Sequence, residues 1–173
     1  VQQFPFLQPP INKFIQDGYQ LLFEIDAVDK DFKILPMGHR LAKLPLDPSL
    51  GRILIESNKQ ACLNEILIII SALSISDPRE RPLEKAQKAD QAHLLFHDPD
   101  SGFMSFIKLW KLLDEKISIK SGKGLRTFCQ QYFVSYTRIR EWQELYKQLT
   151  EMTKELDFKV SKKEVTYERI HIS

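Results

Sequence analysis

The feature that most constrains the fold is an apolar run at residues 63–75, which is hydrophobic nearly all the way round a helix. Its stretch Ile66–Ile70 also suits a buried strand, because periodicity does not separate the two structures in a short run. Asn64, Glu65 and Ala72, with the short loop before the run, favour a helix. Such a helix must be covered on every side, so we expect a helical bundle around it.

The segments on either side of this run have the spacing of amphipathic helices. Asp47 is a suitable N-cap with Pro48 at the first helical position, so one helix is predicted to begin there and to precede the apolar run. Ser101 follows Pro99 and is placed to begin another. Further helices are predicted at residues 83–96, 101–116, 125–133 and 136–156, with a mobile loop at 117–124.

The first 46 residues predict a separate small module. Its expected elements are a helix at 12–25, a short strand within 27–35 and a brief helix between Pro36 and Pro45. This order resembles a degenerate winged helix. The last helix offers only His39, Arg40 and Lys43 as cationic or titratable side chains, which favours a structural module over a DNA-groove reader.

The C-terminal residues 158–173 alternate polar and apolar side chains and are β-prone. Val1 is not an initiator methionine, and the last residues read as the start of a strand, so we expect a fragment of a longer protein. The predicted fold is mainly α. It comprises a small winged-helix module at 1–46, a helical bundle at 47–157 and a short β-prone stub at 158–173.

A charged segment bounded by prolines follows the apolar run, and we call residues 77–82 the elbow. Arg79, Glu80 and Arg81 stand between Pro78 and Pro82. One interpretation is a solvated turn between two helices, in which exposed charges contribute little free energy. The other is a docking surface where these three side chains meet another domain.

The net charge of +2 conceals an uneven distribution. Residues 1–107 hold 11 basic and 14 acidic side chains, whereas residues 108–173 hold 14 basic and 9 acidic ones. A basic block on a near-neutral protein is typical of a polyanion-binding surface, although solvated helical faces are often basic too. Its candidate phosphate ligands are Lys108, Lys111, Arg126, Arg138 and Arg140.

Arg138 and Arg140 differ in their surroundings. They point about 200° apart on a helix, so they cannot line one groove together. Arg140 has Glu144 one turn further on as an ion-pair partner, whereas Arg138 has no acidic residue at that spacing and is expected to be the freer of the two. Ser135 and Tyr136 add a hydroxyl and a stacking ring, a combination found in single-stranded RNA sites.

Two patterns that can indicate enzymes are better explained otherwise. The segment 121–124 is similar to the end of a phosphate loop, but Ile117, five positions before Gly122, stands where glycine is required, and Gly124 stands where serine or threonine is required. His93 and His97 share a helical face, but the glutamate of the zinc-protease pattern is missing. We therefore expect no catalytic residue, no metal site and no cofactor in this chain.

The remaining composition indicates a cytoplasmic location. The two cysteines lack CxxC partners and fit reduced thiols. The longest apolar stretch is far below the roughly 18 residues of a membrane span. The N-terminus also lacks the pattern of a secretory signal.

Three stretches, taken together, resemble a known family. The segment "LAKLPLDPSLGRILIESNKQACLNEILIIISALSISDPRERP", followed by "DPDSGFMSFIKLWKLL" and "FCQQYFVSYTRIREWQELYKQL", resembles the helicase-associated region of DEAH-box ATP-dependent RNA helicases. The elbow looks specifically like that of the bacterial HrpA type. The sequence departs from many eukaryotic relatives at Gly102-Phe103, where they carry Asp-His.

The resemblance implies a winged helix and a ratchet-like helical bundle that carry no catalysis of their own. In this family two RecA-like motor domains hold ATP and magnesium, and an OB fold follows the bundle. Its implied partners are single-stranded RNA, with DNA as an alternative, and the RecA-like domains and OB fold of the same polypeptide, acting as a monomer. The RNA-facing helix of the family corresponds to residues 132–141. A scaffold that positions other domains without touching nucleic acid is the alternative.

Overall fold

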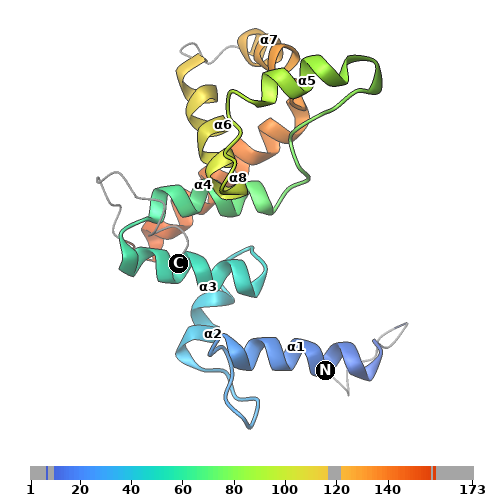
Figure 1. Ribbon diagram of the computed structural model, residues 1–173. Coiled ribbons are helices and arrows are strands. Elements are labelled where there is room, and N and C mark those ends of the chain that lie inside the picture. Colours follow the sequence, from blue (N-terminus) through green and yellow to red (C-terminus); the bar gives the residue numbers. More distant parts are fainter. Residues whose placement is uncertain (1–6, 8–9, 117–121, 157, 159–173) are drawn as a thin grey trace. The chain divides into compact units, whose positions relative to one another are not determined.

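The computed structural model describes residues 7, 10–116, 122–156 and 158, and these are mainly helical (Figure 1). The prediction of a mainly α fold is confirmed. The elements are α1 (Asn12–Glu24), α2 (Pro36–Leu41), α3 (Pro48–Gln60), α4 (Leu63–Leu73), the 3-10 helix η1 (Leu83–Lys85), α5 (Ala86–His93), α6 (Gly102–Lys116), α7 (Gly122–Tyr132) and α8 (Tyr136–Glu155). The chain divides into two compact units, residues 1–55 and 56–173, which are described separately below.

In the first unit, the helices form where the sequence predicts them but the strand does not. The predicted strand within 27–35 is reduced to a single antiparallel bridge between Val28 and Ile34. The Asp29 carboxylate accepts hydrogen bonds from the backbone N–H groups of Asp31 and Lys33, at 2.8 and 2.9 Å. Phe32 is in the left-handed region at φ 60°. This tight turn uses the residues that a longer strand would need.

Gly38 of helix α2 lies close to the backbone of Ala27. A Cβ atom added there would collide with the carbonyl oxygen of Ala27, which also accepts a 2.9 Å hydrogen bond from Leu35 N–H. Glycine is therefore required for this packing.

Helix α3 begins as its sequence predicts. The Asp47 carboxylate accepts a 2.9 Å hydrogen bond from Ser49 N–H, and its backbone carbonyl accepts one from Gly51 N–H. The first N–H groups of a helix have no intrahelical acceptor, so this cap fixes the helix start.

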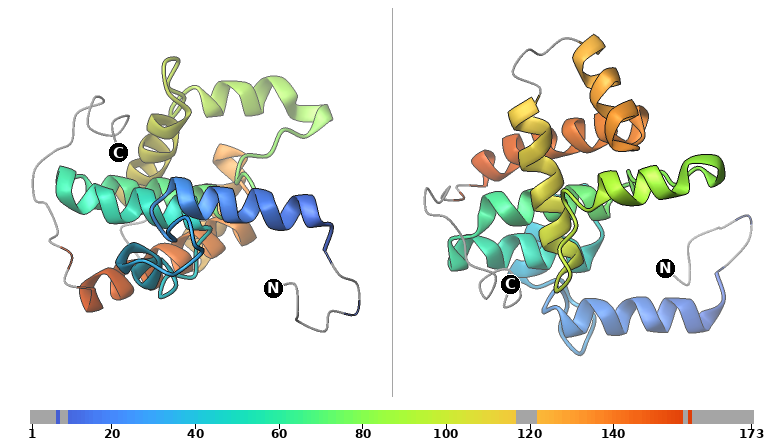
Figure 2. Two further views of the ribbon diagram at one scale, coloured as in Figure 1. Left: turned by 90° about the horizontal axis from the view of Figure 1, so that it is seen from below. Right: turned by 45° about the horizontal axis from the view of Figure 1, so that its top comes forward.

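Helix α4 forms the centre of the second unit. The apolar run is a helix and not a strand, and its residues Ile66–Ala72 are all buried. Helices α6 and α8 both pack against it, as two views of the ribbon show (Figure 1; Figure 2). Trp142 of α8 is fully buried, and its indole N–H lies 3.0 Å from both Ile68 O and Ser71 Oγ. This polar contact joins α8 to the middle of α4.

Two other predicted boundaries need correction. The single helix predicted at 83–96 is η1 followed by α5, which ends at His93. Helix α7 begins at Gly122, so the prediction that 122–124 belong to a loop is wrong, while 117–121 lie outside the described residues. The first turn of a helix makes few internal N–H bonds, which is why glycines are tolerated there. The β-prone stub, apart from Phe158, also lies outside the described residues.

Candidate nucleic-acid interface

The candidate interface starts at the tight turn between α7 and α8. Phe133 closes α7 in the left-handed region at φ 50°, and Val134 N–H donates to Cys129 O at 3.0 Å. Helices commonly end this way, although the left-handed residue is usually glycine. Val134 is buried, and α8 begins two residues later at Tyr136.

The elbow lies antiparallel to this turn. Arg79 and Val134 form a β-bridge, in which Glu80 N–H donates to Phe133 O at 2.8 Å and Ser135 N–H donates to Pro78 O at 2.7 Å. The elbow is therefore tied into the bundle by its own backbone.

The two arginines of the elbow are paired within the chain. Arg79 contacts the Asp77 carboxylate through Nε at 2.9 Å and Nη2 at 2.6 Å, and its guanidinium lies 5.7 Å from the Phe106 ring centre. Arg81 makes a similar two-point contact with Asp90, at 2.7 and 2.9 Å. Neither arginine projects as an unpaired charge. Docking through Arg79, Glu80 and Arg81 stays a prediction.

These contacts shift the acidity of Asp77. Burial acts to raise the pKa of its carboxyl, but hydrogen bonds and charge from Arg79 outweigh burial and hold that pKa below its ordinary value of 3.8. The carboxylate therefore stays charged, and the pair persists, at any pH near neutrality.

Arg138 is not the freer of the two arginines on α8, contrary to the sequence-based expectation. Its Nη1 donates to the backbone carbonyl of Asp77 at 2.8 Å. Arg140 is exposed and forms the expected ion pair with Glu144, although at 3.6 Å. Helical spacing could not reveal this contact, because its partner Asp77 lies 61 positions away in the sequence.

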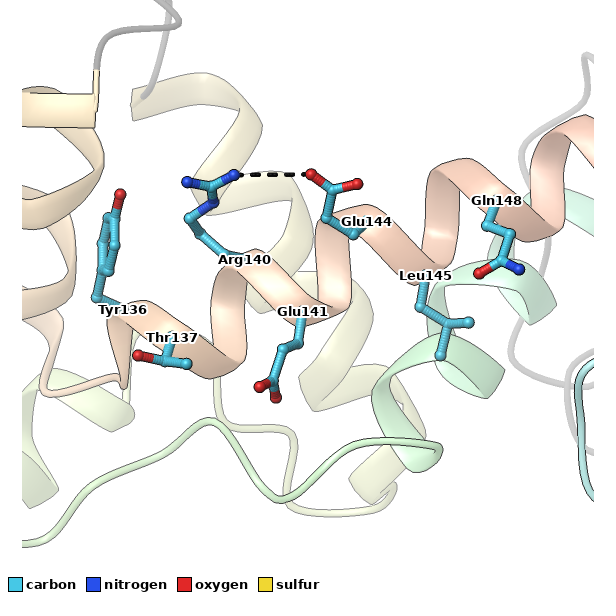
Figure 3. Close-up of a pocket in the computed structure, with 7 residues that line it drawn as sticks. All are labelled: Tyr136, Thr137, Arg140, Glu141, Glu144, Leu145 and Gln148. Carbon is cyan, nitrogen blue, oxygen red and sulfur yellow. Dashed lines mark ion pairs between the residues drawn. The ribbon is translucent and has the colours of Figure 1, made fainter.

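At the beginning of α8, Tyr136 contacts Arg126 and lines a hollow together with Arg140. The Arg126 guanidinium of α7 lies over the Tyr136 ring, 4.6 Å from its centre, which is a cation–π contact. Tyr136 and Arg140 belong to a hollow of about 490 Å³, lined by Tyr136, Thr137, Arg140, Glu141, Glu144, Leu145 and Gln148. Figure 3 shows Tyr136, Arg140 and Glu144 following one another along one side of α8. The hollow thus combines an aromatic ring and a guanidinium.

Two carboxylates in this hollow oppose its positive charge. Glu144 pairs with Arg140, and Glu141 extends from the other side of the helix (Figure 3). A polyanion entering the hollow would have to displace the weak Arg140–Glu144 contact, which is exposed and therefore costs little to break.

The remaining predicted residues lie elsewhere. The Lys108 ammonium is 2.9 Å from the Asp98 carboxylate, which also caps the backbone N–H groups of Asp100 and Ser101. Lys111 is exposed, and its charge partly offsets the burial that raises the pKa of Glu65. Ser135 is held by its backbone N–H at the elbow.

Of the seven predicted residues, Tyr136 and Arg140 line the hollow, and Arg126 contacts the Tyr136 ring. Neither Lys108 nor Lys111 lines the hollow. Thr137, Glu141 and Gln148 were missed by sequence reasoning, although helical spacing links them to the site: Thr137 lies three positions from Arg140, Glu141 four from Thr137, and Gln148 four from Glu144. The Arg126–Tyr136 contact has no local sequence signal.

Within the described residues, no group of three or more histidine, cysteine, aspartate or glutamate side chains is placed to hold a metal ion. No helix in the same part of the chain combines the length and apolar character needed to cross a membrane.

The fold and site define a helicase-associated domain. The family model for the ratchet-like helicase associated domain (HA2) matches residues 47–144, and the model for its winged-helix part matches residues 19–46. The chain belongs to this family, and the predicted resemblance is confirmed.

Similar proteins point to the HrpA type. The ATP-dependent RNA helicase HrpA of Escherichia coli (strain K12) is 42% identical across 100% of this chain, and the HrpA homolog of Haemophilus influenzae is 38% identical across 99%. A pre-mRNA-splicing factor ATP-dependent RNA helicase of Schizosaccharomyces pombe is 27% identical across 84%. The chain spans only 14% of the two bacterial relatives and 12% of the yeast one.

Proposed function

We propose that this chain is a non-catalytic part of an ATP-dependent RNA helicase and guides single-stranded RNA along the start of α8. The observation that carries the proposal is the exposed hollow that Tyr136 and Arg140 line, with the Arg126 guanidinium over the Tyr136 ring. Guanidinium groups bind phosphate oxygens, and an aromatic ring offers a face to an unpaired base. The ion pair to Glu144 is exposed and is exchanged for a phosphate on binding.

The wider role follows from the relatives, whose printed names describe ATP-dependent RNA helicases. In this proposal ATP and magnesium bind to RecA-like domains elsewhere in the polypeptide, and an OB fold lies beyond the bundle. The protein acts as a monomer in the cytoplasm. Single-stranded DNA is the competing substrate, and a matched DNA oligonucleotide decides between them.

The test is fluorescence anisotropy of a fluorescein-labelled single-stranded oligouridylate across a salt series. For single strands, log affinity falls with log salt by about 0.7 for each neutralised phosphate. Arg126→Ala and Arg140→Ala should each weaken binding and reduce that slope by about 0.7. Lys154→Ala removes an exposed cation at the other end of α8 and is the matched control. Affinity that ignores salt, or an equal loss in the control, would reject the phosphate contacts.

A scaffold role has its own supporting observation. Helix α1 has no buried residue, and Ile11 and Phe14 beside and within it are 66% and 65% exposed. Exposed apolar side chains on one helix favour a protein contact. In an intact helicase containing this chain, Phe14→Ser should weaken coupling between ATP turnover and RNA if α1 supports another domain. Combining Arg79→Ala with Arg81→Ala tests the elbow in the same assay, and unchanged RNA-stimulated turnover would reject docking there.

A further inference from the structure

The first turn of α8 is held by a residue that does not line the hollow. Arg138 lies two positions from both Tyr136 and Arg140, and two positions correspond to about 200° around a helix. Tyr136 and Arg140 therefore face the hollow while Arg138 faces the elbow, where its Nη1 donates to Asp77 O at 2.8 Å.

Arg138 is one part of a larger set of contacts, which we call the linker clasp: residues 77–80 of the elbow, residues 133–135 of the turn, and the side chains of Arg138 and His93. Ser135 N–H donates to Pro78 O, and Glu80 N–H donates to Phe133 O. His93 Nε2 lies 3.0 Å from the same Phe133 oxygen, which can only accept, so the ring donates. Four donors thus converge on three carbonyl groups of two linkers.

The clasp holds a turn that is costly on its own. Phe133 has φ 50°, a conformation that residues other than glycine adopt only where the surrounding structure enforces it. Pro78 and Val134, on facing strands of the clasp, are both buried. The clasp contacts surround the turn from which α8 begins.

We propose that Arg138 is a positioning residue for the nucleic-acid interface and not a phosphate ligand. Its bond to the elbow fixes the rotation of the first turn of α8, and this rotation directs Tyr136 and Arg140 toward the hollow. The inference rests on the proposed function for its RNA readout. The clasp itself can be measured without RNA.

The experiment compares Arg138→Ala, Arg138→Lys and Arg140→Ala in the whole chain. Amide hydrogen exchange is followed by NMR at Glu80 and Ser135, whose N–H groups form the bridge, and at Ile70 in the buried helix α4 as a reference. In Arg138→Ala the two bridge amides should exchange faster while Ile70 is unchanged. Arg138→Lys keeps a donor and should restore part of the protection, and Arg140→Ala should leave all three unchanged.

Binding of the labelled oligouridylate provides the second readout. Arg138→Ala should weaken affinity about three- to tenfold through lost preorganisation, with the salt slope unchanged. Arg140→Ala should reduce the slope by about 0.7. A slope reduced equally by Arg138→Ala would make Arg138 a phosphate ligand and overturn the proposal, as would unchanged exchange at Glu80 and Ser135.

Failure of the Arg138→Ala variant to fold and failure of the wild-type chain to bind RNA lead to different conclusions. If Arg138→Ala does not fold, Arg138→Gln keeps a shorter donor and is judged by the same two readouts. If the wild-type chain does not bind the oligouridylate, the proposed function fails. The amide exchange then still decides whether Arg138 holds the clasp.

Discussion

Replacing Trp142 with phenylalanine should destabilise the second unit through two separate losses. The indole is fully buried between α4, α6 and α8, and its N–H donates to both Ile68 O and Ser71 Oγ. Losing a neutral buried hydrogen bond costs about 1 kcal/mol, and removing part of a packed ring adds about 1–2 kcal/mol.

The cost stays at this level because neither acceptor is left without a partner. Ser71 Oγ still donates to Leu67 O at 2.6 Å, and Ile68 O is an interior carbonyl of α4 that accepts the helical N–H four residues on. An orphaned buried acceptor would add a desolvation penalty, which does not arise here. We therefore expect a loss of about 2–3 kcal/mol in the free energy of unfolding.

Urea unfolding followed by tryptophan fluorescence is the appropriate assay. The chain has two tryptophans, Trp110 and Trp142, both in the second unit, so the remaining one reports on that unit alone. Trp110→Phe is the matched control. Trp110 is only half-buried and makes an edge contact with the Trp142 ring and a tilted contact with the Tyr146 ring, so replacing it with phenylalanine should cost about 1 kcal/mol or less.

A double-mutant cycle with Ser71→Ala isolates the polar contact. The coupling between Ser71 and Trp142 should be about 0.5–1.5 kcal/mol. If Trp142→Phe costs no more than Trp110→Phe, or if the coupling is zero, the indole does not anchor α8 to α4 and the reasoning is refuted.

Three other predictions follow from individual residues. Ala61 lies in the left-handed region at φ 57°, so Ala61→Gly should raise the free energy of unfolding by about 0.5–1 kcal/mol. The control Ala92→Gly, inside helix α5, should lower it by a similar amount. A change in the same direction for both variants would contradict this prediction. Gly38→Ala should lower the free energy of unfolding by about 1–3 kcal/mol because its Cβ meets Ala27 O, whereas Gly18→Ala on the open face of α1 should raise it by about 0.5–1 kcal/mol. Thermal unfolding followed by circular dichroism measures both changes. A Gly38→Ala variant as stable as wild type would exclude the close approach. Burial raises the pKa of Glu65 above its ordinary 4.5, so its protonated form favours the folded state and the stability it supplies is lost as the pH rises through the folded pKa. The Tm of Glu65→Gln relative to wild type should therefore increase from about pH 4 to about pH 7, and a constant difference would show that burial does not shift this group.

Local signals in the sequence were sufficient for most of the helices. The Asp47-Pro48 start, the Ser101 start and the amphipathic stripe of α8 depend on neighbours within a few residues, and the structure places helices there. The predicted strand within 27–35 does not form because hydrogen bonds to the Asp29 carboxylate stabilise a turn, and this turn competes with β-strand hydrogen bonding.

The candidate site was less predictable because its contacts are distant in sequence. Arg138 of α8 contacts Asp77, 61 positions away, and His93 of α5 contacts Phe133, 40 positions away. Helical spacing correctly paired Arg140 with Glu144, but it made Arg138 look free because no acid lies one turn away. A backbone carbonyl as the acceptor leaves no trace in the side-chain pattern.

The most direct test of the account is the salt dependence of single-stranded RNA binding by wild type, Arg140→Ala and Lys154→Ala, measured by fluorescence anisotropy. We predict a clear slope for wild type and the Lys154 variant, and a slope smaller by about 0.7 for Arg140→Ala. Identical slopes for all three proteins, or no salt dependence at all, would contradict an RNA-binding surface at the start of α8.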